Sequence, residues 1–305
     1  MPRSSPARPL VGIALILTAM AILPTIDVLA KFLGQAGMPI LMIVWARALF
    51  GALLTLPFAL RADGVHAFRP ARPLHHIVRA ALLFTATFSF FTALKHLPIA
   101  DALAIFFVNP LVIVVLSALI LGEKVGPRRW TAVMVGFIGT LIIIRPGLVN
   151  LNPGTLYALV SGVALGSYFV MTRHIAGQSD AMVLTFQTSA LGAVLMTLAL
   201  PFVWTTPSPQ QWLMFAALGV IATFAHNLIT RAYEHAEASL LAPLAFTEII
   251  MATLLGWWFF GDLPVGWTVL GVTILIASAV YISVREQHAA HRQRQAERRA
   301  DVRVL

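Results

Sequence analysis

The 305-residue sequence contains no cysteine. Without thiols there can be no disulfides, no thiolate zinc site, no c-type haem attachment and no cysteine nucleophile. Charged residues are also scarce, at 11% of the chain, while hydrophobic residues make up 59% and the mean hydropathy is +0.86. Because so few charges cannot coat a soluble globule of this size, the composition predicts a polytopic membrane protein.

Several functional motifs are missing as well. There is no phosphate-cradling GxxxxGK[ST] loop, so ATP is not expected to drive the protein directly, and neither HExxH nor GxSxG occurs. We therefore expect no catalytic residues, no metal and no cofactor. The net charge of +9 could indicate nucleic-acid binding, but the arginines lie in short runs between apolar segments, so no nucleic-acid partner is expected.

Two functional classes are alternatives to a small-molecule carrier: an intramembrane enzyme, and a sensor or scaffold. An intramembrane enzyme acting on lipid-linked substrates would need acids and histidines clustered at one membrane interface, whereas the buried acids here are dispersed. A sensor or scaffold would not need two matched broken helices. A carrier of a small molecule, surrounded by membrane lipid, agrees best with the sequence.

Ten apolar runs are each long enough, at about 20 residues of helix, to cross the hydrocarbon core. Because unpaired backbone groups cannot face lipid, each run is predicted to be a helix. Residues 1–21 resemble a signal peptide, but the apolar run continues past them, so we expect the segment to be retained. The runs lie near residues 10–32, 39–60, 75–94, 98–121, 129–145, 154–173, 181–204, 211–233, 238–260 and 265–284.

Basic residues give the predicted orientation, because cytoplasmic loops collect Lys and Arg. With both termini inside, only Lys31, Lys95 and Arg145 lie outside and Arg47 lies within a span, which leaves 17 of the 21 basic residues on the inner side. We therefore predict a multi-pass bacterial inner-membrane protein, monomeric or homodimeric. Residues 1–9 and the basic tail 286–305 are predicted to be cytoplasmic.

Residues 93–124 and 232–263 align without a gap and share one order of features. Each stretch opens on a polar turn, crosses an apolar run that holds one proline, Pro110 or Pro243, and closes on glycine and an acid. A proline removes a backbone donor, so both are predicted to break their helices, and matched breaks point to a substrate site or gate. A simple packing kink is the alternative.

The fold prediction is an all-α membrane protein of ten transmembrane helices. Two five-helix repeats, residues 10–147 and 154–285, are expected to surround a central cavity. Because each repeat has an odd number of spans, the second must enter the membrane upside down. This inverted arrangement is typical of secondary transporters that work by alternating access.

The run GEKVGPRRWTAVMVGFIGTLIIIRPG, residues 122–147, preceded by LPIADALAIFFVNP, resembles the first repeat of the EamA-type transporters in the drug/metabolite transporter superfamily. The resemblance extends from about residue 10 to residue 285 and implies a ten-helix carrier with a central cavity. Asp27-x-x-x-Lys31 together with Trp45-Ala46-Arg47 is similar to the riboflavin and S-adenosylmethionine carriers. The implied substrate is riboflavin or a related heteroaromatic metabolite, with S-adenosylmethionine uptake and amino-acid or drug export as alternatives.

Arg47 and Glu248 are charged residues deep within predicted spans. Arg47 lies about eight residues, or roughly 12 Å, from the outer boundary, where an isolated arginine costs at least ~2.5 kcal/mol. We predict that Arg47 orients an anionic or carbonyl-bearing substrate. Glu248 is predicted to bind a cationic group or exchange a proton. The alternative is a structural ion pair of Arg47 with Glu248 or with Asp27.

Other polar residues complete the predicted site. Asp27 and Lys31 are one helical turn apart, so they either pair or act as a gate. Asn109 is the predicted neutral substrate ligand, because it lies beside the helix break. Polar residues within spans serve either as interhelical hydrogen bonds or as substrate contacts. Those predicted to contact substrate are His226, Asn227, Tyr168 and Gln187.

Overall fold

The computed structural model describes residues 9–70, 72–120, 122, 127–144, 152–175, 181–235, 244, 247–274, 276–277 and 280–281. Within these residues the chain forms helices joined by turns, and no strand occurs among them. Three predictions lie outside the described residues: the helix break at Pro243, the N-terminal segment 1–8 and the basic tail 286–305.

Helices begin at or beside prolines at many points, since the proline ring suits the first turn of a helix. The first half contains α1 (Pro9–Gln35), α2 (Ile40–Asp63), the 3-10 helix η1 (Gly64–Phe68), α3 (Pro73–Ala93), α4 (Ile99–Phe106), α5 (Asn109–Ile120) and α6 (Pro127–Ile144). The second half contains α7 (Pro153–His174), α8 (Ala181–Thr197), the 3-10 helix η2 (Leu200–Phe202), α9 (Pro209–His235), α11 (Thr247–Phe260) and a helical segment at 266–274.

Six of the described helical segments have the length and composition of membrane spans. Large apolar side chains stay exposed on the outer surface of the bundle, for example Leu119 at 73% and Trp258 at 75%, as expected for side chains in contact with lipid. These observations confirm the predicted all-α membrane protein. Six helical segments are long and apolar enough to cross a membrane: Leu10–Gln35, Ile40–Phe68, Pro73–Ala93, Ile99–Ile120, Pro153–Thr172 and Pro209–Ile229. Two shorter apolar helices are Met182–Thr197 and Thr247–Phe260.

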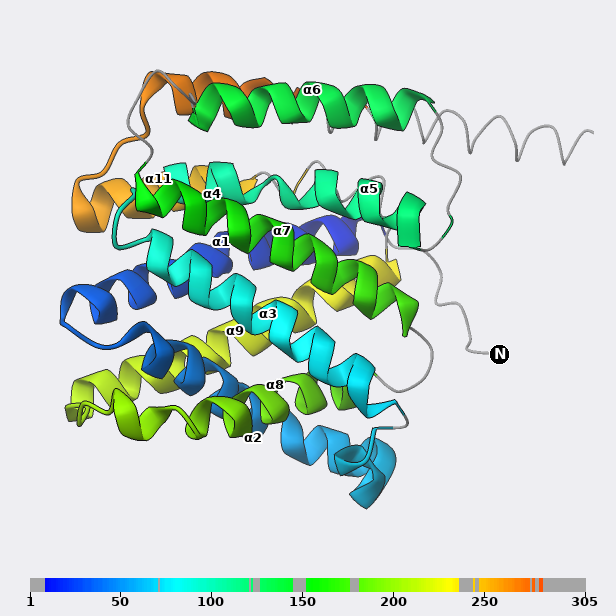
Figure 1. Cartoon of the computed structure of the whole chain (residues 1–305), viewed down its shortest axis with the longest axis vertical. Helices are drawn as coiled ribbons and strands as arrows, with labels where there is room; N and C mark the ends of the chain where they lie inside the picture. The colour runs from blue at the N-terminus through cyan, green and yellow to red at the C-terminus, as the bar shows by residue number, and fades with distance from the viewer. Residues whose placement is uncertain are drawn as a thin grey trace, which may run out of the picture.

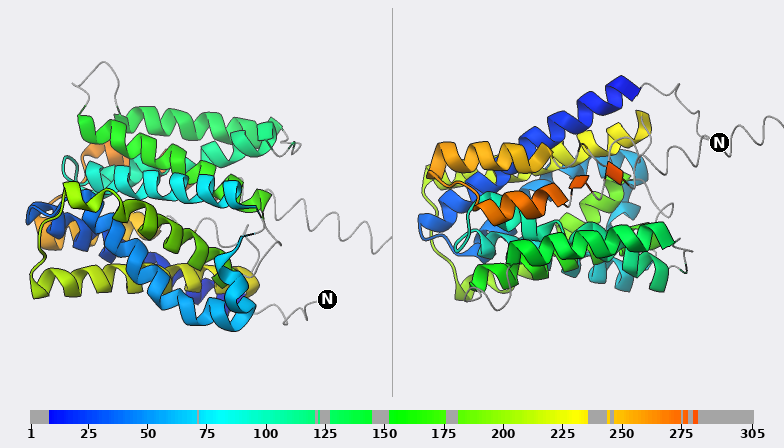
Figure 2. Two further views of the ribbon diagram at one scale, coloured as in Figure 1. Left: turned by 60° about the horizontal axis from the view of Figure 1, so that its bottom comes forward. Right: turned by 90° about the horizontal axis from the view of Figure 1, so that it is seen from above.

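The helices run roughly along one direction, so their turns collect at two opposite ends of the bundle (Figures 1 and 2). We call one the Gly37 end, after the turn between α1 and α2. The α3–α4 turn, the α8–α9 connection and the end of α11 also lie there. Gly37 has a φ of 82°, a conformation that costs glycine little. The opposite Phe68 end holds the start of α1 and η1.

Three helix pairs form the centre of the bundle. The most extensive contacts join α1 to α9, α3 to α7 and α2 to α8. Around them, α1 also contacts α11, while α7 also contacts α4 and α5. Helix α6 contacts α4 and α5 and lies in an outer layer, at the top of Figure 1.

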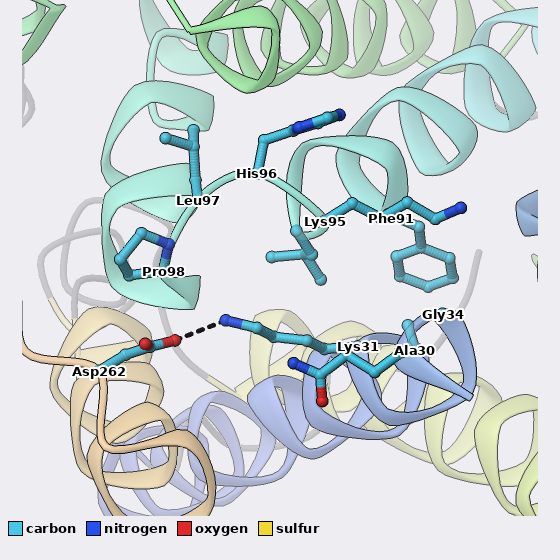
Figure 3. Close-up of a pocket in the computed structure, with 11 residues that line it drawn as sticks. Ala30, Lys31, Gly34, Phe91, Lys95, His96, Leu97, Pro98 and Asp262 are labelled. Atoms are coloured by element: carbon cyan, nitrogen blue, oxygen red, sulfur yellow. Dashed lines mark hydrogen bonds and ion pairs between the residues drawn. The ribbon is translucent and has the colours of Figure 1, made fainter. Parts of the chain in front are cut away.

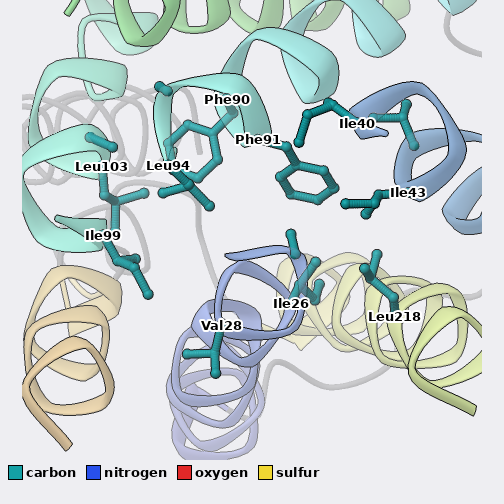
Figure 4. Packing of buried hydrophobic residues seen from close by; sticks show 14 of the residues in the cluster. Ile26, Val28, Ile40, Ile43, Phe90, Phe91, Leu94, Ile99, Leu103 and Leu218 are labelled. Atoms are coloured by element: carbon teal, nitrogen blue, oxygen red, sulfur yellow. The ribbon is translucent and has the colours of Figure 1, made fainter. Parts of the chain in front are cut away.

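The largest apolar cluster fills the part of the bundle near the Gly37 end (Figure 4). Most of its members come from α1, α2, α3, α4 and α9, and they are nearly inaccessible to solvent. The bundle is therefore closed by apolar packing towards the Gly37 end. The residues labelled in Figure 4 are Ile26, Val28, Ile40, Ile43, Phe90, Phe91, Leu94, Ile99, Leu103 and Leu218.

Candidate substrate site

Arg47 is the charged residue at the centre of the candidate site. It lies about two helical turns after the start of α2, and its Nη1 donates a hydrogen bond of 2.6 Å to Thr87 Oγ1 on α3. The Thr87 hydroxyl donates in turn to the Leu83 carbonyl at 3.0 Å, so its oxygen is oriented as an acceptor for the guanidinium. No carboxylate of the described residues lies within ion-pair distance of Arg47. The direct structural ion pair is therefore not formed among them.

Three other predicted residues lie near this arginine, and a fourth lies near one of them. The charge of Arg47 interacts over a longer distance with Asp27 of α1 and Tyr168 of α7, and with His226 of α9. Asp27 interacts in turn with Glu248 of α11. Five side chains from well-separated parts of the sequence thus gather in one region of the bundle.

These polar groups keep some accessible surface. Asp27 is 8% exposed, Arg47 and Glu248 are half-buried, and His226 is exposed. Contact with water at such surface lowers the cost of a charge within a membrane span. No three His, Asp or Glu side chains of the described residues are grouped to hold a metal.

Pro110 coincides with a break between α4, which ends at Phe106, and α5, which begins at Asn109. Because Pro110 has no N–H, the Phe106 carbonyl loses its regular helical partner. The Asn109 side chain replaces that partner, since its Nδ2 donates to the Phe106 oxygen at 3.0 Å. The amide nitrogen of Asn109, predicted to contact substrate, is therefore engaged in stabilising the break.

Helix α7 covers this break through two glycines. A Cβ placed at Gly162 would lie 2.6 Å from the Phe106 carbonyl oxygen, and one at Gly166 would lie 2.9 Å from the Asn109 carbonyl oxygen. Both distances are too short for a real side chain, so the close approach requires glycine. Irregular backbone persists at membrane depth only where protein or water covers it, and α7 provides that cover.

Glu248 is opposite Asn109 when residues 232–263 are aligned with residues 93–124. It lies in the first turn of α11, where a carboxylate interacts favourably with the positive end of the helix dipole. The preceding Thr247 hydroxyl donates to the Leu244 carbonyl at 2.6 Å. An acid at the start of this helix therefore combines a favourable local field with access to the charged region around Arg47.

Gln187 is the predicted site residue that lies furthest from this arrangement. It is buried on α8, and its Nε2 donates to the Ala67 carbonyl of η1 at 3.0 Å. This contact connects α8 to the Phe68 end, so we interpret Gln187 as a packing residue. Asn227 is half-buried on α9. Its neighbour His226 donates from Nδ1 to the Ala222 carbonyl of its own helix at 2.8 Å.

Arg79 is a buried cation that the predicted orientation counted among the 17 basic residues of the inner side, near the start of the predicted span 75–94. It is only 3% exposed on α3. Its guanidinium donates to Thr172 Oγ1 at 3.0 Å, to the Leu184 carbonyl at 3.3 Å and to the Tyr168 hydroxyl at 3.2 Å. Arg79 thus fastens α3 to α7 and α8 and orients Tyr168, and its place in a basic inner segment hid this role.

Lys31 forms its ion pair with Asp262 and not with Asp27. Lys31 Nζ lies 2.5 Å from Asp262 Oδ2 and 4.6 Å from the centre of the Phe260 ring. Because Asp262 directly follows α11, this pair joins α1 to α11 at the Gly37 end. The predicted i,i+4 pair of Asp27 and Lys31 is not among the ion pairs of the described residues, and the role of Asp262 was missed.

The arrangement of helices and buried charges is that of a membrane carrier, and comparison with known proteins gives the family. The model of the EamA-like transporter family matches residues 10–145 and 152–284. The chain belongs to the EamA-like transporter family. It is therefore a membrane transporter and not an enzyme, as the sequence predicts.

Relatives in this family carry different substrate names. The S-adenosylmethionine uptake transporter of Rickettsia prowazekii is 25% identical over 261 residues, which cover 86% of this chain and 88% of that one. The riboflavin transporter of Vibrio cholerae is 28% identical over 292 residues, covering 94% and 97%. A solved crystal structure of a protein aligns with a TM-score of 0.64 and 21% identity over 92% of this chain and 97% of that one, and it shows the fold alone.

Proposed function

We propose that this protein is a secondary transporter that moves a small heteroaromatic metabolite across the bacterial inner membrane by alternating access. Its ten spans would form two inverted repeats, residues 10–147 and 154–285, with both termini in the cytoplasm. The absence of a phosphate-binding loop agrees with transport that ATP does not drive directly. The start of α1 and η1 lie at the same end of the bundle (Figure 1), which agrees with the predicted orientation.

The packing of the helices supports the inverted repeat. If α7, α8 and α9 are the counterparts of α1, α2 and α3, then exchanging the halves converts the α1–α9 contact into the α7–α3 contact, and both are extensive. The exchange leaves the α2–α8 contact unchanged. It turns the α1–α11 contact into the contacts that α7 makes with α4 and α5. A two-fold relation between the halves accounts for all of these pairs, and it is the relation that alternating access uses.

The charges around Arg47 carry the proposal on substrate class. Two carboxylates, Asp27 and Glu248, and one guanidinium gather in this region. A guanidinium suits a carboxylate of the substrate, and two acids suit positively charged groups. S-adenosylmethionine has this combination, because it carries a carboxylate, an ammonium and a sulfonium beside its adenine ring. We therefore place it ahead of riboflavin, which the sequence alone favoured.

Riboflavin is the second candidate. The riboflavin transporter of Vibrio cholerae aligns with 94% of this chain. Aromatic residues are also present two residues before Arg47 on α2: the Trp45 ring contacts Trp204 and Trp212 edge-to-face, with ring centres 6.2 Å and 6.4 Å apart. Aromatic side chains can stack on a flat conjugated ring. Riboflavin has no charge that would require two carboxylates.

Uptake of labelled substrate tests the proposal. Cells that cannot make riboflavin, and cells that lack an S-adenosylmethionine carrier, would each express this chain or its Glu248→Gln variant. We expect saturable uptake of S-adenosylmethionine that unlabelled riboflavin inhibits poorly and that the variant weakens, since it removes one of the two carboxylates. Uptake of riboflavin alone would reverse the ranking. With membrane insertion verified, uptake of neither compound would reject both assignments, and accumulation assays for amino-acid and drug export would follow.

A further inference from the structure

A polar cavity lies at the Gly37 end, outside the region around Arg47. It has a volume of about 430 Å³ and lies between the end of α1, the α3–α4 turn and the residue after α11 (Figure 3). Phe91 supplies part of its apolar wall, and its polar side chains are those of Lys31, Gln35, Lys95, His96 and Asp262. With two lysines and one aspartate, the lining carries a net positive charge.

The two lysines differ in their surroundings. Lys31 is 10% exposed and paired with Asp262, whose side chain is 29% exposed. Lys95 is exposed, and its aliphatic chain lies over Gly34, where an added Cβ would be 3.7 Å from Lys95 Cε. No acid within the described part of the chain forms an ion pair with Lys95. The cavity therefore combines a paired lysine with an accessible one.

The position of these lysines requires an explanation. The predicted orientation leaves only three basic residues on the outer side, and two of them line this single cavity. Basic residues are disfavoured at outer loops compared with cytoplasmic ones, so a concentration of them at one point is not accounted for by topology. Anion binding accounts for it, because a cavity lined by one sign of charge concentrates ligands of the other.

The cavity also lies in line with the charged region deeper in the bundle. Lys31 and Asp27 are four residues apart on α1, which places them on one face with a separation of about 6 Å along the helix. The Lys31–Asp262 pair and the apolar cluster at the Gly37 end lie between Asp27 and the solvent at that end. A ligand in the cavity would therefore wait directly outside the closed end of the bundle.

We propose that this cavity is an anion site that receives the carboxylate end of the transported metabolite, with Lys95 as its first contact and Lys31 as its second. A bound carboxylate competes with Asp262 for Lys31, so binding weakens the only described ion pair between α1 and the end of α11. Occupancy of the cavity then favours opening of the Gly37 end. The proposal rests on the proposed transport function only for the identity of the ligand.

The absence of cysteine allows a direct test. Gln35 lines the cavity and is exposed, so Gln35→Cys gives purified full-length protein a single thiol there. Its reaction rates with a negatively charged and a positively charged methanethiosulfonate reagent report the local potential. We expect the negative reagent to be favoured. Lys95→Gln should slow the negative reagent and speed the positive one, each about threefold, the factor that one unit charge several ångströms away produces in water. The ratio of the two rates should therefore fall about tenfold.

Arg61→Gln is the matched control, because it removes one positive charge from the last turn of α2 near the Phe68 end. Its rate ratio should equal that of Gln35→Cys alone. Asp262→Asn should raise the ratio, since it releases Lys31. The site would be overturned if Lys95→Gln and Arg61→Gln changed the rate ratio by the same factor, or if neither variant changed it.

Protection by small probes tests the ligand class. L-methionine carries a carboxylate, and L-methioninol is the same molecule with that group replaced by an alcohol. We expect L-methionine to slow labelling of Gln35→Cys and L-methioninol to leave it unchanged, with protection lost in Lys95→Gln. Equal protection by both probes, or by neither, would overturn carboxylate binding. This assay needs no transport, so its result is separate from failure of the uptake experiment.

Discussion

The Asn109 side chain donates a hydrogen bond of 3.0 Å to the Phe106 carbonyl, the group that a regular helix would pair with the N–H of residue 110. Residue 110 is proline, so the chain itself supplies a replacement donor one residue earlier. The break between α4 and α5 is therefore a stable feature of the fold, and not a helix end left unpaired inside the membrane.

Asn109→Ala should destabilise the protein, because it leaves the Phe106 carbonyl without this donor. An unpaired buried carbonyl costs about 1–3 kcal/mol, which a lower midpoint of thermal unfolding in detergent would reveal. Pro110→Ala restores an N–H at the position that a regular helix uses. The double variant Asn109→Ala/Pro110→Ala should therefore be more stable than Asn109→Ala alone. If Asn109→Ala weakens substrate binding without changing stability, the amide is a ligand and not a helix partner.

Much of the fold could be predicted from the sequence because membrane spans leave strong signals. Long apolar runs, prolines and scarce charges are local features, and the helix break at Pro110 follows from one missing donor. Deeply placed charges were likewise visible: Arg47 and Glu248 stand out because a charge in a span is costly. The proximity of Arg47 to Asp27 and His226 agrees with the proposed inverted repeat.

Contacts between distant segments could not be predicted in this way. Lys31 was expected to pair or gate with Asp27, one turn away, but its partner is an acid 231 residues later in the chain. A short-range pair on a helix is worth only about 0.2–0.5 kcal/mol, so tertiary packing decides between such partners. Arg79 was counted with the inner basic residues because only its place along the chain was known, and not its tertiary partners. Its three hydrogen-bond partners come from α7 and α8, which no local pattern links to it.

Gly162→Ala should impair folding more than Gly51→Ala does. A Cβ at Gly162 would meet the Phe106 carbonyl oxygen at 2.6 Å, whereas one at Gly51 would lie 3.4 Å from Ser189 Oγ. Forcing apart packed helices costs about 1–3 kcal/mol, so we expect a lower unfolding midpoint and reduced transport for Gly162→Ala. Gly51→Ala should remain close to the wild type. Similar unfolding midpoints for the two variants would contradict the close approach of α7 to the helix break.

Reversing the Lys31–Asp262 pair should separate its charge interaction from the individual side chains. Lys31→Asp and Asp262→Lys each bring two like charges together at the Gly37 end, so each should lower transport and stability. The double variant Lys31→Asp/Asp262→Lys restores opposite charges and should recover at least part of both. Unfolding midpoints and uptake of all four proteins give a double-mutant cycle. Purely additive losses would mean that the two charges do not interact in the membrane.

Arg47→Gln should raise the KM for a carboxylate-bearing substrate by at least about tenfold, because a hydrogen bond to a charged group contributes about 1.5–3 kcal/mol. Thr87→Val keeps the charge but removes the acceptor that orients the guanidinium at 2.6 Å. We expect a smaller, few-fold change for Thr87→Val. Concentration-dependent uptake in cells with equal amounts of inserted protein measures both. An unchanged KM in Arg47→Gln would show that the guanidinium does not meet the substrate.

Glu248→Gln should abolish the pH dependence of transport while leaving the protein folded and inserted. Glu248 is the carboxylate at the start of α11, half-buried and beside Asp27, so its proton can be exchanged from an accessible space. Glutamine has nearly the same shape but cannot ionise, and the uptake rate of the variant should then be flat between mildly acidic and mildly alkaline medium. Asp27→Asn is the matched control, since it removes the neighbouring carboxylate and should weaken transport without flattening the profile. If the Asp27 variant alone loses its pH dependence, the exchanged proton belongs to Asp27, and a profile that stays pH-dependent in Glu248→Gln rejects the proton role of Glu248.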